Sequence, residues 1–140
     1  MTDELHLLNA LTAVAEAGKQ DFRREMAVRG FPWHLTASGE VLAYLEPAGL
    51  SQTSLTERMG LSKQAVQQLL DRLEAEAVIR REPDPLDKRA RRIVLTELGL
   101  RDLAERRLVL RDIEERYRET LGKKLHSKLE KALRKLAAAG

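Results

Sequence analysis

Amide and basic side chains share one face of a helix that is predicted to begin at Ser62. The outward face carries Lys63, Gln64, Gln67, Gln68 and Arg72, and the opposite side carries Val66, Leu69, Leu70 and Leu73. A glutamine side chain can form paired hydrogen bonds with the major-groove edge of adenine, and lysine or arginine can do so with guanine. The pattern therefore predicts a surface that reads bases. The alternative for an isolated polar face is a helix that is only solvated.

A second group of charged residues lies between Arg80 and Arg92, where six basic side chains stand against three acidic ones. The basic residues are Arg80, Arg81, Lys88, Arg89, Arg91 and Arg92. Short aliphatic runs flank this stretch and prolines interrupt it, so two antiparallel strands with a charged loop are predicted. Such a loop can insert a guanidinium into the minor groove while its neighbours bind phosphates. The alternative is that the charges only protect the edge of a two-stranded ribbon.

Cap signals connect the base-reading helix to the elements before it. Ser51 is a predicted N-cap for a short helix that must end at Gly60, and Ser62 caps the next helix. A short helix, a tight turn and a longer helix form a helix-turn-helix. We expect a further helix before this motif, from Thr36 to about Leu45.

Longer helices are predicted at both ends of the chain. Residues 3–28 contain no proline and repeat apolar residues at spacings of three and four, up to a stop at Gly30. Thr96 caps a fifth helix, Gly122 interrupts it, and a sixth helix follows. A small monomer would leave these apolar stripes in water, so they predict a dimer.

Residues 50–99 resemble the winged helix-turn-helix of the MarR family of bacterial transcription regulators. Two segments carry the resemblance: residues 51–62, which run into the helix through Asp71-Arg72-Leu73-Glu74, and residues 87–99. The second segment is similar to the Asp-x-Arg wing signature of the family, followed by the Leu-Thr opening of the next helix. Because the flanking helices agree in number and order, the resemblance extends over essentially the whole chain.

The resemblance implies a mainly α fold, a winged helix-turn-helix with a two-stranded β-wing flanked by N- and C-terminal dimerisation helices. We expect one domain over residues 1–140, with dimerisation helices in 1–30 and 97–140 and a winged-helix DNA-binding lobe in 35–96. The implied DNA contacts are Ser62, Lys63, Gln64, Gln67, Gln68, Arg72, Lys88, Arg89 and Arg91. Arg89 would be the minor-groove arginine, and Asp87 would orient the wing by pairing with a nearby arginine.

Two positions depart from the pattern of the family. Ala77 stands where the family usually has a glycine, so we expect a strained turn into the wing. Gly39 lies within the expected second helix and weakens it.

Four of the five aromatic residues fall between residues 22 and 44, together with a histidine. These residues are Phe22, Phe31, Trp33, His34 and Tyr44. In the family, this region often forms a pocket for phenolic or aromatic-acid ligands, so a small aromatic effector is one interpretation. Ordinary core packing is the other interpretation.

The amino-acid composition limits the classes of protein to which this chain can belong. A net charge of +3 and a pI near 9.4 are compatible with a nucleic-acid partner. The absence of cysteine excludes thiolate metal sites and redox sensing by a thiol. The three histidines are scattered, and acid pairs such as Glu114-Glu115 are interpreted as solvated, so we expect no metal, no cofactor and no enzyme activity. With neither a signal pattern nor a membrane-length apolar run, we expect a cytoplasmic protein without a membrane partner.

Together these features predict a sequence-specific transcription regulator that binds double-stranded DNA as a homodimer. A palindromic operator and repression are expected from the resemblance. Two alternatives stay open: a winged-helix module that engages an acidic protein partner, and a non-specific architectural DNA binder. The amide-rich face argues against the second alternative.

Overall fold

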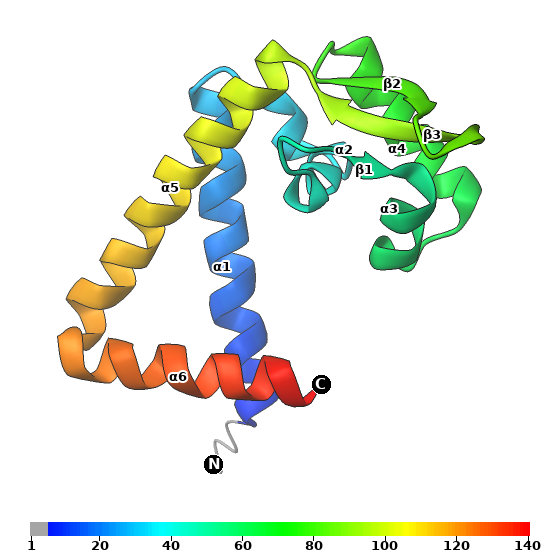
Figure 1. The fold of residues 1–140 in the computed structure, drawn as a ribbon. Coiled ribbons are helices and arrows are strands. Elements are labelled where there is room, and N and C mark those ends of the chain that lie inside the picture. The colour runs from blue at the N-terminus through cyan, green and yellow to red at the C-terminus, as the bar shows by residue number, and fades with distance from the viewer. Residues whose placement is uncertain (1–5) are drawn as a thin grey trace. The chain divides into compact units, whose positions relative to one another are not determined.

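The computed structural model describes residues 6–140, which form two compact units (Figure 1). One unit combines the described residues up to Phe22 with Arg107–Gly140, and the other comprises Arg23–Arg106. The predicted start of the first helix at Asp3 lies outside the described residues.

The chain forms mainly helices, with a small antiparallel sheet in the middle. In chain order the elements are α1 (Leu7–Val28), the 3₁₀ turn η1 (Pro32–Leu35), α2 (Ser38–Val41), the 3₁₀ turn η2 (Leu42–Tyr44), β1 (Leu50–Ser51), α3 (Gln52–Met59), α4 (Lys63–Ala75), β2 (Ile79–Asp84), β3 (Asp87–Leu95), α5 (Glu97–Leu121) and α6 (Lys123–Ala139). The predicted fold class, a mainly α winged helix, is confirmed.

The predicted caps of the helix-turn-helix are confirmed. The Ser51 hydroxyl accepts a hydrogen bond from the Ser54 amide at 3.1 Å, and the Ser62 hydroxyl accepts one from the Ala65 amide at 3.1 Å. Gly60 ends α3 with a φ of 65°, a left-handed conformation that glycine adopts without strain. Local side-chain chemistry therefore sets the start of both helices and the turn between them.

The wing contains one strand more than predicted. β2 and β3 form the expected antiparallel hairpin, with Ile79 opposite Leu95. The short strand β1 pairs with the other edge of β3, with Leu50 opposite Ile93, which gives the sheet order β1-β3-β2. The wing is thereby tied to the residue that caps α3.

The predicted helix from Thr36 to about Leu45 is present as a continuous helical run over residues 38–44, but its start and its helix type differ from the prediction. The α-helical part is only α2, and 3₁₀ turns lie on both sides of it. Thr36 does not cap a helix start, because its hydroxyl donates to the Trp33 carbonyl at 2.8 Å and closes η1. Gly39 permits a close approach of α2 to η1, since a Cβ at this position would lie 2.7 Å from the His34 Cα.

The turn from α4 into the wing has the strain expected at Ala77. Its φ is 60°, and no other described non-glycine residue has a positive φ. The amide of Val78 donates to the Leu73 carbonyl at 3.0 Å, so the chain closes α4 and enters β2 within a few residues. This left-handed conformation costs a residue with a Cβ about 1 to 2 kcal/mol.

The core of the unit Arg23–Arg106 lies between α4, α3 and the sheet. Val66, Leu70 and Leu73 on α4 are fully buried, as their predicted inward face requires, and Leu69 is half-buried. Leu55 of α3 and Ile93 of β3 are also fully buried. The core therefore holds the polar face of α4 outward.

The other unit packs the first part of α1 against the ends of α5 and α6. Gly18 allows this contact, because a Cβ there would lie 2.5 Å from the Tyr117 hydroxyl oxygen. Its described surface leaves several leucines exposed: Leu7, Leu8, Leu110, Leu125, Leu129, Leu133 and Leu136. None of the helices in residues 6–140 combines the length and the apolar character needed to cross a membrane.

Candidate nucleic-acid interface

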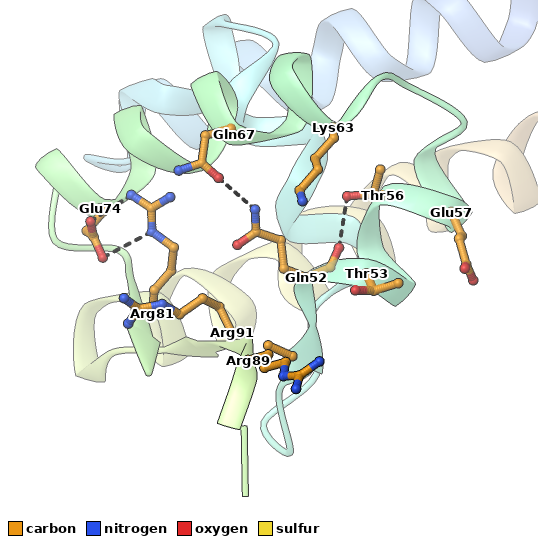
Figure 2. Close-up of a pocket in the computed structure, with 11 residues that line it drawn as sticks. Gln52, Thr53, Thr56, Glu57, Lys63, Gln67, Glu74, Arg81, Arg89 and Arg91 are labelled. Atoms are coloured by element: carbon orange, nitrogen blue, oxygen red, sulfur yellow. Dashed lines mark hydrogen bonds and ion pairs between the residues drawn. The ribbon is translucent and has the colours of Figure 1, made fainter. Parts of the chain in front are cut away.

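A cavity of about 680 Å³ lies between α3, α4 and the wing (Figure 2). Its lining includes Lys63 and Gln67 from α4, Gln52 from α3, and Arg89 and Arg91 from β3. Residues from the helix-turn-helix and from the wing therefore line one concave surface. That surface combines amide groups with cations.

The amide face of α4 points outward, as the sequence predicts. Lys63, Gln64, Gln67, Gln68 and Arg72 are all exposed. Among the described residues, neither Gln64 nor Gln68 has a hydrogen-bond partner, so both amide groups are available to a ligand. Ser62 is exposed too, but its hydroxyl already accepts the Ala65 amide as the helix cap.

Gln67 is held differently from the other two glutamines. Its side-chain oxygen accepts a hydrogen bond from the Gln52 amide at 2.7 Å, as Figure 2 shows. One donor–acceptor pair is thus used within the protein, and Gln67 retains its amide nitrogen as a donor. The contact links α3 to α4, and we expect Gln67 to present a more rigid group than Gln64.

Sequence reasoning overlooked the residues that α3 contributes to the cavity. Gln52, Thr53 and Thr56 line it, and the Thr56 hydroxyl donates to the Gln52 carbonyl at 2.9 Å. The sequence spacing could have identified these three residues. They are the first, second and fifth residues of a helix capped at Ser51, and such positions share the side of the helix next to the turn.

The wing carries exposed cations from Lys88 to Arg91. Lys88, Arg89 and Arg91 are exposed, and Arg89 and Arg91 reach the cavity. The structure gives Asp87 a different partner from the arginine that the resemblance implies. Its carboxylate accepts the backbone amide of Arg89 at 3.0 Å, which positions the Arg89 backbone at the start of β3.

Arg81 belongs to the basic group predicted for the wing but is used within the protein. Its guanidinium lies 2.6 Å from an Asp71 carboxylate oxygen and 2.8 Å from one of Glu74, both on α4. The hydrogen bond from Arg81 lowers the pKa of Glu74, and the hydrogen bonds to Glu74 and Asp71 raise the pKa of Arg81. This clamp, formed by Arg81, Asp71 and Glu74, ties β2 to α4. Figure 2 shows its contact between Arg81 and Glu74.

The predicted effector residues are mostly core residues. Phe31, Trp33 and His34 are buried, and the rings of Phe31 and Trp33 meet edge to face with centroids 5.7 Å apart. The Trp33 indole donates to Asp102 at 2.8 Å, and the His34 Nε2 lies 2.7 Å from the same carboxylate oxygen. The polar atoms of Trp33 and His34 that face Asp102 are therefore satisfied inside the fold.

Asp102 is fully buried and was not anticipated from the sequence. Its other oxygen accepts Arg106 Nε at 2.8 Å, and Arg106 also donates to the Leu42 carbonyl at 2.7 Å. The spacing of four between Asp102 and Arg106 on a helix was the available signal. This network connects α5 to η1 and η2 inside the unit.

Two of the five predicted effector residues line cavities. Phe22 lines a cavity in the unit that contains α6, and Trp33 lines one beside Thr36 and Arg72 in the unit Arg23–Arg106. Tyr44 is exposed, with 36% of its surface accessible.

Comparisons with known proteins agree with this architecture. The MarR family model matches residues 37–90. The transcriptional repressor CouR, solved with a 23-mer DNA duplex, is 27% identical, with a TM-score of 0.73 over 94% of this chain and 92% of that one. The regulator Tm0710 from Thermotoga maritima is 26% identical, with a TM-score of 0.63 over 93% of this chain and 90% of that one.

A third structure extends the similarity at the level of the fold. A MarR mutant from E. coli, complexed with operator DNA, is 20% identical, with a TM-score of 0.74 over 93% of this chain and 92% of that one. A search of curated protein sequences finds no match. The predicted resemblance to the MarR family is therefore confirmed, by the family match over residues 37–90 and by the MarR winged-helix fold of the chain.

Proposed function

We propose that this protein is a homodimeric transcription regulator that binds a palindromic operator and represses transcription there. The observation that carries the proposal is that Lys63 and Gln67 of α4 line one concave surface with Arg89 and Arg91 of the wing. Gln64 and Gln68 do not line this cavity, but both are exposed on the same helix. The CouR structure contains a bound DNA duplex and the E. coli MarR mutant structure is a complex with operator DNA, which supports the same assignment here.

The two parts of the surface have different roles in this proposal. Gln64 and Gln68 on α4 read base edges in the major groove, because their amides are exposed and have no partner among the described residues. Lys88, Arg89 and Arg91 bind the minor groove and the phosphates, where positive charge contributes affinity rather than base preference. Gln67 contributes only the donor that its bond to Gln52 leaves available.

The dimer rests on the exposed leucines of α1, α5 and α6. Leu125 and Leu136 are more than half exposed on α6, and Leu8 is 73% exposed on α1. A second copy of the chain would remove these side chains from water. Two copies would also present two α4 helices to the DNA, which favours an operator with two half-sites about one helical turn apart.

The decisive experiment is selection of tight binders from a random duplex library, followed by variants measured on the selected site and on random duplex. We expect a palindrome. Gln64→Ala should cost roughly 1 to 3 kcal/mol on the selected site and relax base preference there. Gln20→Ala, an equally exposed glutamine on α1, is the matched control and should change neither value.

The wing is tested by salt dependence. Arg89→Ala should weaken binding to selected and random duplex alike, and Arg91→Ala should reduce the salt slope by about 1 if the guanidinium meets one phosphate. Equal losses on both duplexes for Gln64→Ala would contradict base reading. Failure to bind any duplex would instead favour the module with an acidic protein partner.

A small aromatic effector stays a prediction. Because Trp33 is the single tryptophan and bonds to buried Asp102, its fluorescence reports any ligand that disturbs this network. A panel of phenolic and aromatic acids that changes neither the fluorescence nor DNA binding would favour the packing interpretation of the aromatic cluster.

A further inference from the structure

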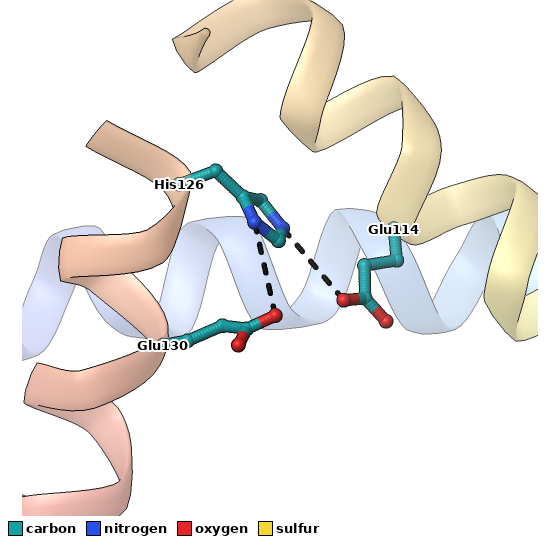
Figure 3. A group of neighbouring side chains, drawn as sticks. All are labelled: Glu114, His126 and Glu130. Atoms are coloured by element: carbon teal, nitrogen blue, oxygen red, sulfur yellow. Dashed lines mark ion pairs between the residues drawn. The ribbon is translucent and has the colours of Figure 1, made fainter. Parts of the chain in front are cut away.

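Three side chains that are scattered in sequence converge in the unit that contains α6. Glu114 comes from α5, and His126 and Glu130 come from α6 (Figure 3). No metal site is predicted from the sequence, because the histidines are scattered and Glu114 is interpreted as solvated. Residues 114 and 126 are distant in sequence, but the turn at Gly122 places the start of α6 beside the end of α5.

The turn at Gly122 is what brings the two helices together. Gly122 has a φ of 81°, in the region that favours glycine, and α6 begins at the next residue. The amide of His126 donates to the Gly122 carbonyl at 3.0 Å, so the histidine lies in the first turn of α6. Glu130 follows four residues later and shares its helix face.

The distances within the group are too long for direct hydrogen bonds, and the two carboxylates face different nitrogens of the imidazole, only one of which would bind an ion. The His126 Nε2 lies 3.8 Å from a Glu114 oxygen, and the His126 Nδ1 lies 3.7 Å from a Glu130 oxygen. Both distances exceed the range of about 2.7 to 3.2 Å for a nitrogen–oxygen hydrogen bond. One ligand atom from each of the three residues can be chosen so that all three lie within 4.8 Å of one another. Two ligand atoms bound to one ion at about 2.0 to 2.2 Å lie at most about 4.4 Å apart, so the side chains need only small rotations to close around an ion.

Burial distinguishes this group from an ordinary surface ion pair. The His126 side chain is 7% exposed, whereas those of Glu114 and Glu130 are 51% and 39% exposed. The nitrogen ligand therefore lies in the interior, and the carboxylates lie toward solvent. All three line a cavity of about 600 Å³, which has room for an ion and its water.

A neighbouring cation orients one of the carboxylates. Arg134 lies 3.5 Å from one Glu130 oxygen, and the other Glu130 oxygen is the one that faces His126. An outer partner of this kind holds a metal ligand in position. The group therefore offers one imidazole and two carboxylates as ligands, and both carboxylates face the imidazole.

We propose that Glu114, His126 and Glu130 bind one divalent transition-metal ion per chain. Imidazole favours zinc and its neighbours over magnesium or calcium, and carboxylates accept the same ions. Three protein ligands leave a fourth position for water in a tetrahedral zinc site. The ion would join α5 to α6 and stabilise the turn at Gly122. This proposal does not depend on DNA binding, since all three ligands lie outside the residues proposed to contact DNA.

The test uses the full chain, stripped of metal with a chelator and titrated with Zn²⁺ against a chromophoric competitor. We expect one zinc ion per chain. Glu114→Gln and Glu130→Gln should each weaken zinc affinity by at least about tenfold, because the amide is a much poorer ligand for zinc than the carboxylate. Glu115→Gln is the matched control: it removes the same charge from an adjacent exposed residue that pairs with Arg118, and it should leave the affinity unchanged.

Cobalt provides a second, spectroscopic readout, in which circular dichroism checks that each variant is folded. Co²⁺ bound by three protein ligands should give visible absorption bands, and His126→Gln should abolish them. The proposal is overturned if the wild-type chain takes up no zinc, or if Glu114→Gln and Glu130→Gln titrate like Glu115→Gln.

Discussion

The clamp between β2 and α4 predicts a substitution that lowers the stability of the fold without changing DNA binding. Arg81 on β2 contacts Asp71 and Glu74 on α4 with nitrogen–oxygen distances of 2.6 and 2.8 Å. The perturbation is Arg81→Met, which keeps most of the aliphatic stem and removes the guanidinium. Because this arginine is occupied inside the protein, we expect the change to lower stability and to leave the salt slope of DNA binding unaltered.

The size of the expected loss of stability follows from the solvent exposure of the three side chains. The Arg81 side chain is 14% exposed, but those of Asp71 and Glu74 are 56% and 43% exposed, so solvent screens both pairs. Exposed ion pairs contribute about 0.2 to 1 kcal/mol each, which gives about 1 kcal/mol for two pairs that share one guanidinium. With a urea m-value of about 1 to 3 kcal/mol/M, the unfolding midpoint should fall by roughly 0.5 M.

The stabilising effect of the clamp depends on pH. Hydrogen bonding to Arg81 lowers the pKa of Glu74 in the folded state, so its contribution is complete above the unfolded pKa of about 4.3. The contribution disappears as the pH falls through the lowered folded pKa. The stability difference between wild type and Arg81→Met should therefore be constant between neutral pH and about pH 5 and should shrink below about pH 4.

The assay is urea unfolding at equal chain concentration, because dimerisation makes the midpoint depend on concentration. A double-mutant cycle with Glu74→Gln isolates the pair. The reasoning is refuted if Glu74→Gln costs as much in the Arg81→Met background as in wild type, or if Arg81→Met changes the salt slope as Arg91→Ala does.

Four further substitutions test the fold and the dimer. Ala77→Gly should raise stability by about 1 kcal/mol in urea unfolding, because the φ of 60° strains alanine and not glycine; an unchanged midpoint would show that no strain is present. Gly99→Ala should lower stability by about 1 to 3 kcal/mol in the same assay, since its Cβ would lie 2.3 Å from the Val78 carbonyl oxygen; a neutral effect would contradict the close packing. Leu125→Glu, at a side chain 53% exposed, should give folded monomers in sedimentation and circular dichroism, and a variant that stays dimeric would place the interface elsewhere. Ile113→Glu is the contrasting change: this residue is 6% exposed within its own unit, so we expect unfolding rather than clean dissociation.

The sequence by itself determined the helix-turn-helix and the side of α4 that faces outward. The caps at Ser51 and Ser62 and the stop at Gly60 act within a single helical turn, so they can be read without knowing what lies nearby. The outward amide face follows from the helical period together with the burial of Val66 and Leu70. The strain at Ala77 was expected from the resemblance instead, because the family usually has a glycine at this position and glycine adopts a left-handed conformation without strain.

Only the tertiary structure decided which polar side chains are already bonded to other residues of the protein. Arg81 was one of the basic residues counted in the predicted wing, and folding placed it beside Glu74. His34 was one of the predicted effector residues, and folding placed it against Asp102. Glu114 and His126 looked unrelated until the turn at Gly122 brought α6 back to α5. Local signals depend on neighbours within about four residues, whereas the partner of a charged group depends on contacts between distant segments that form only when the core packs.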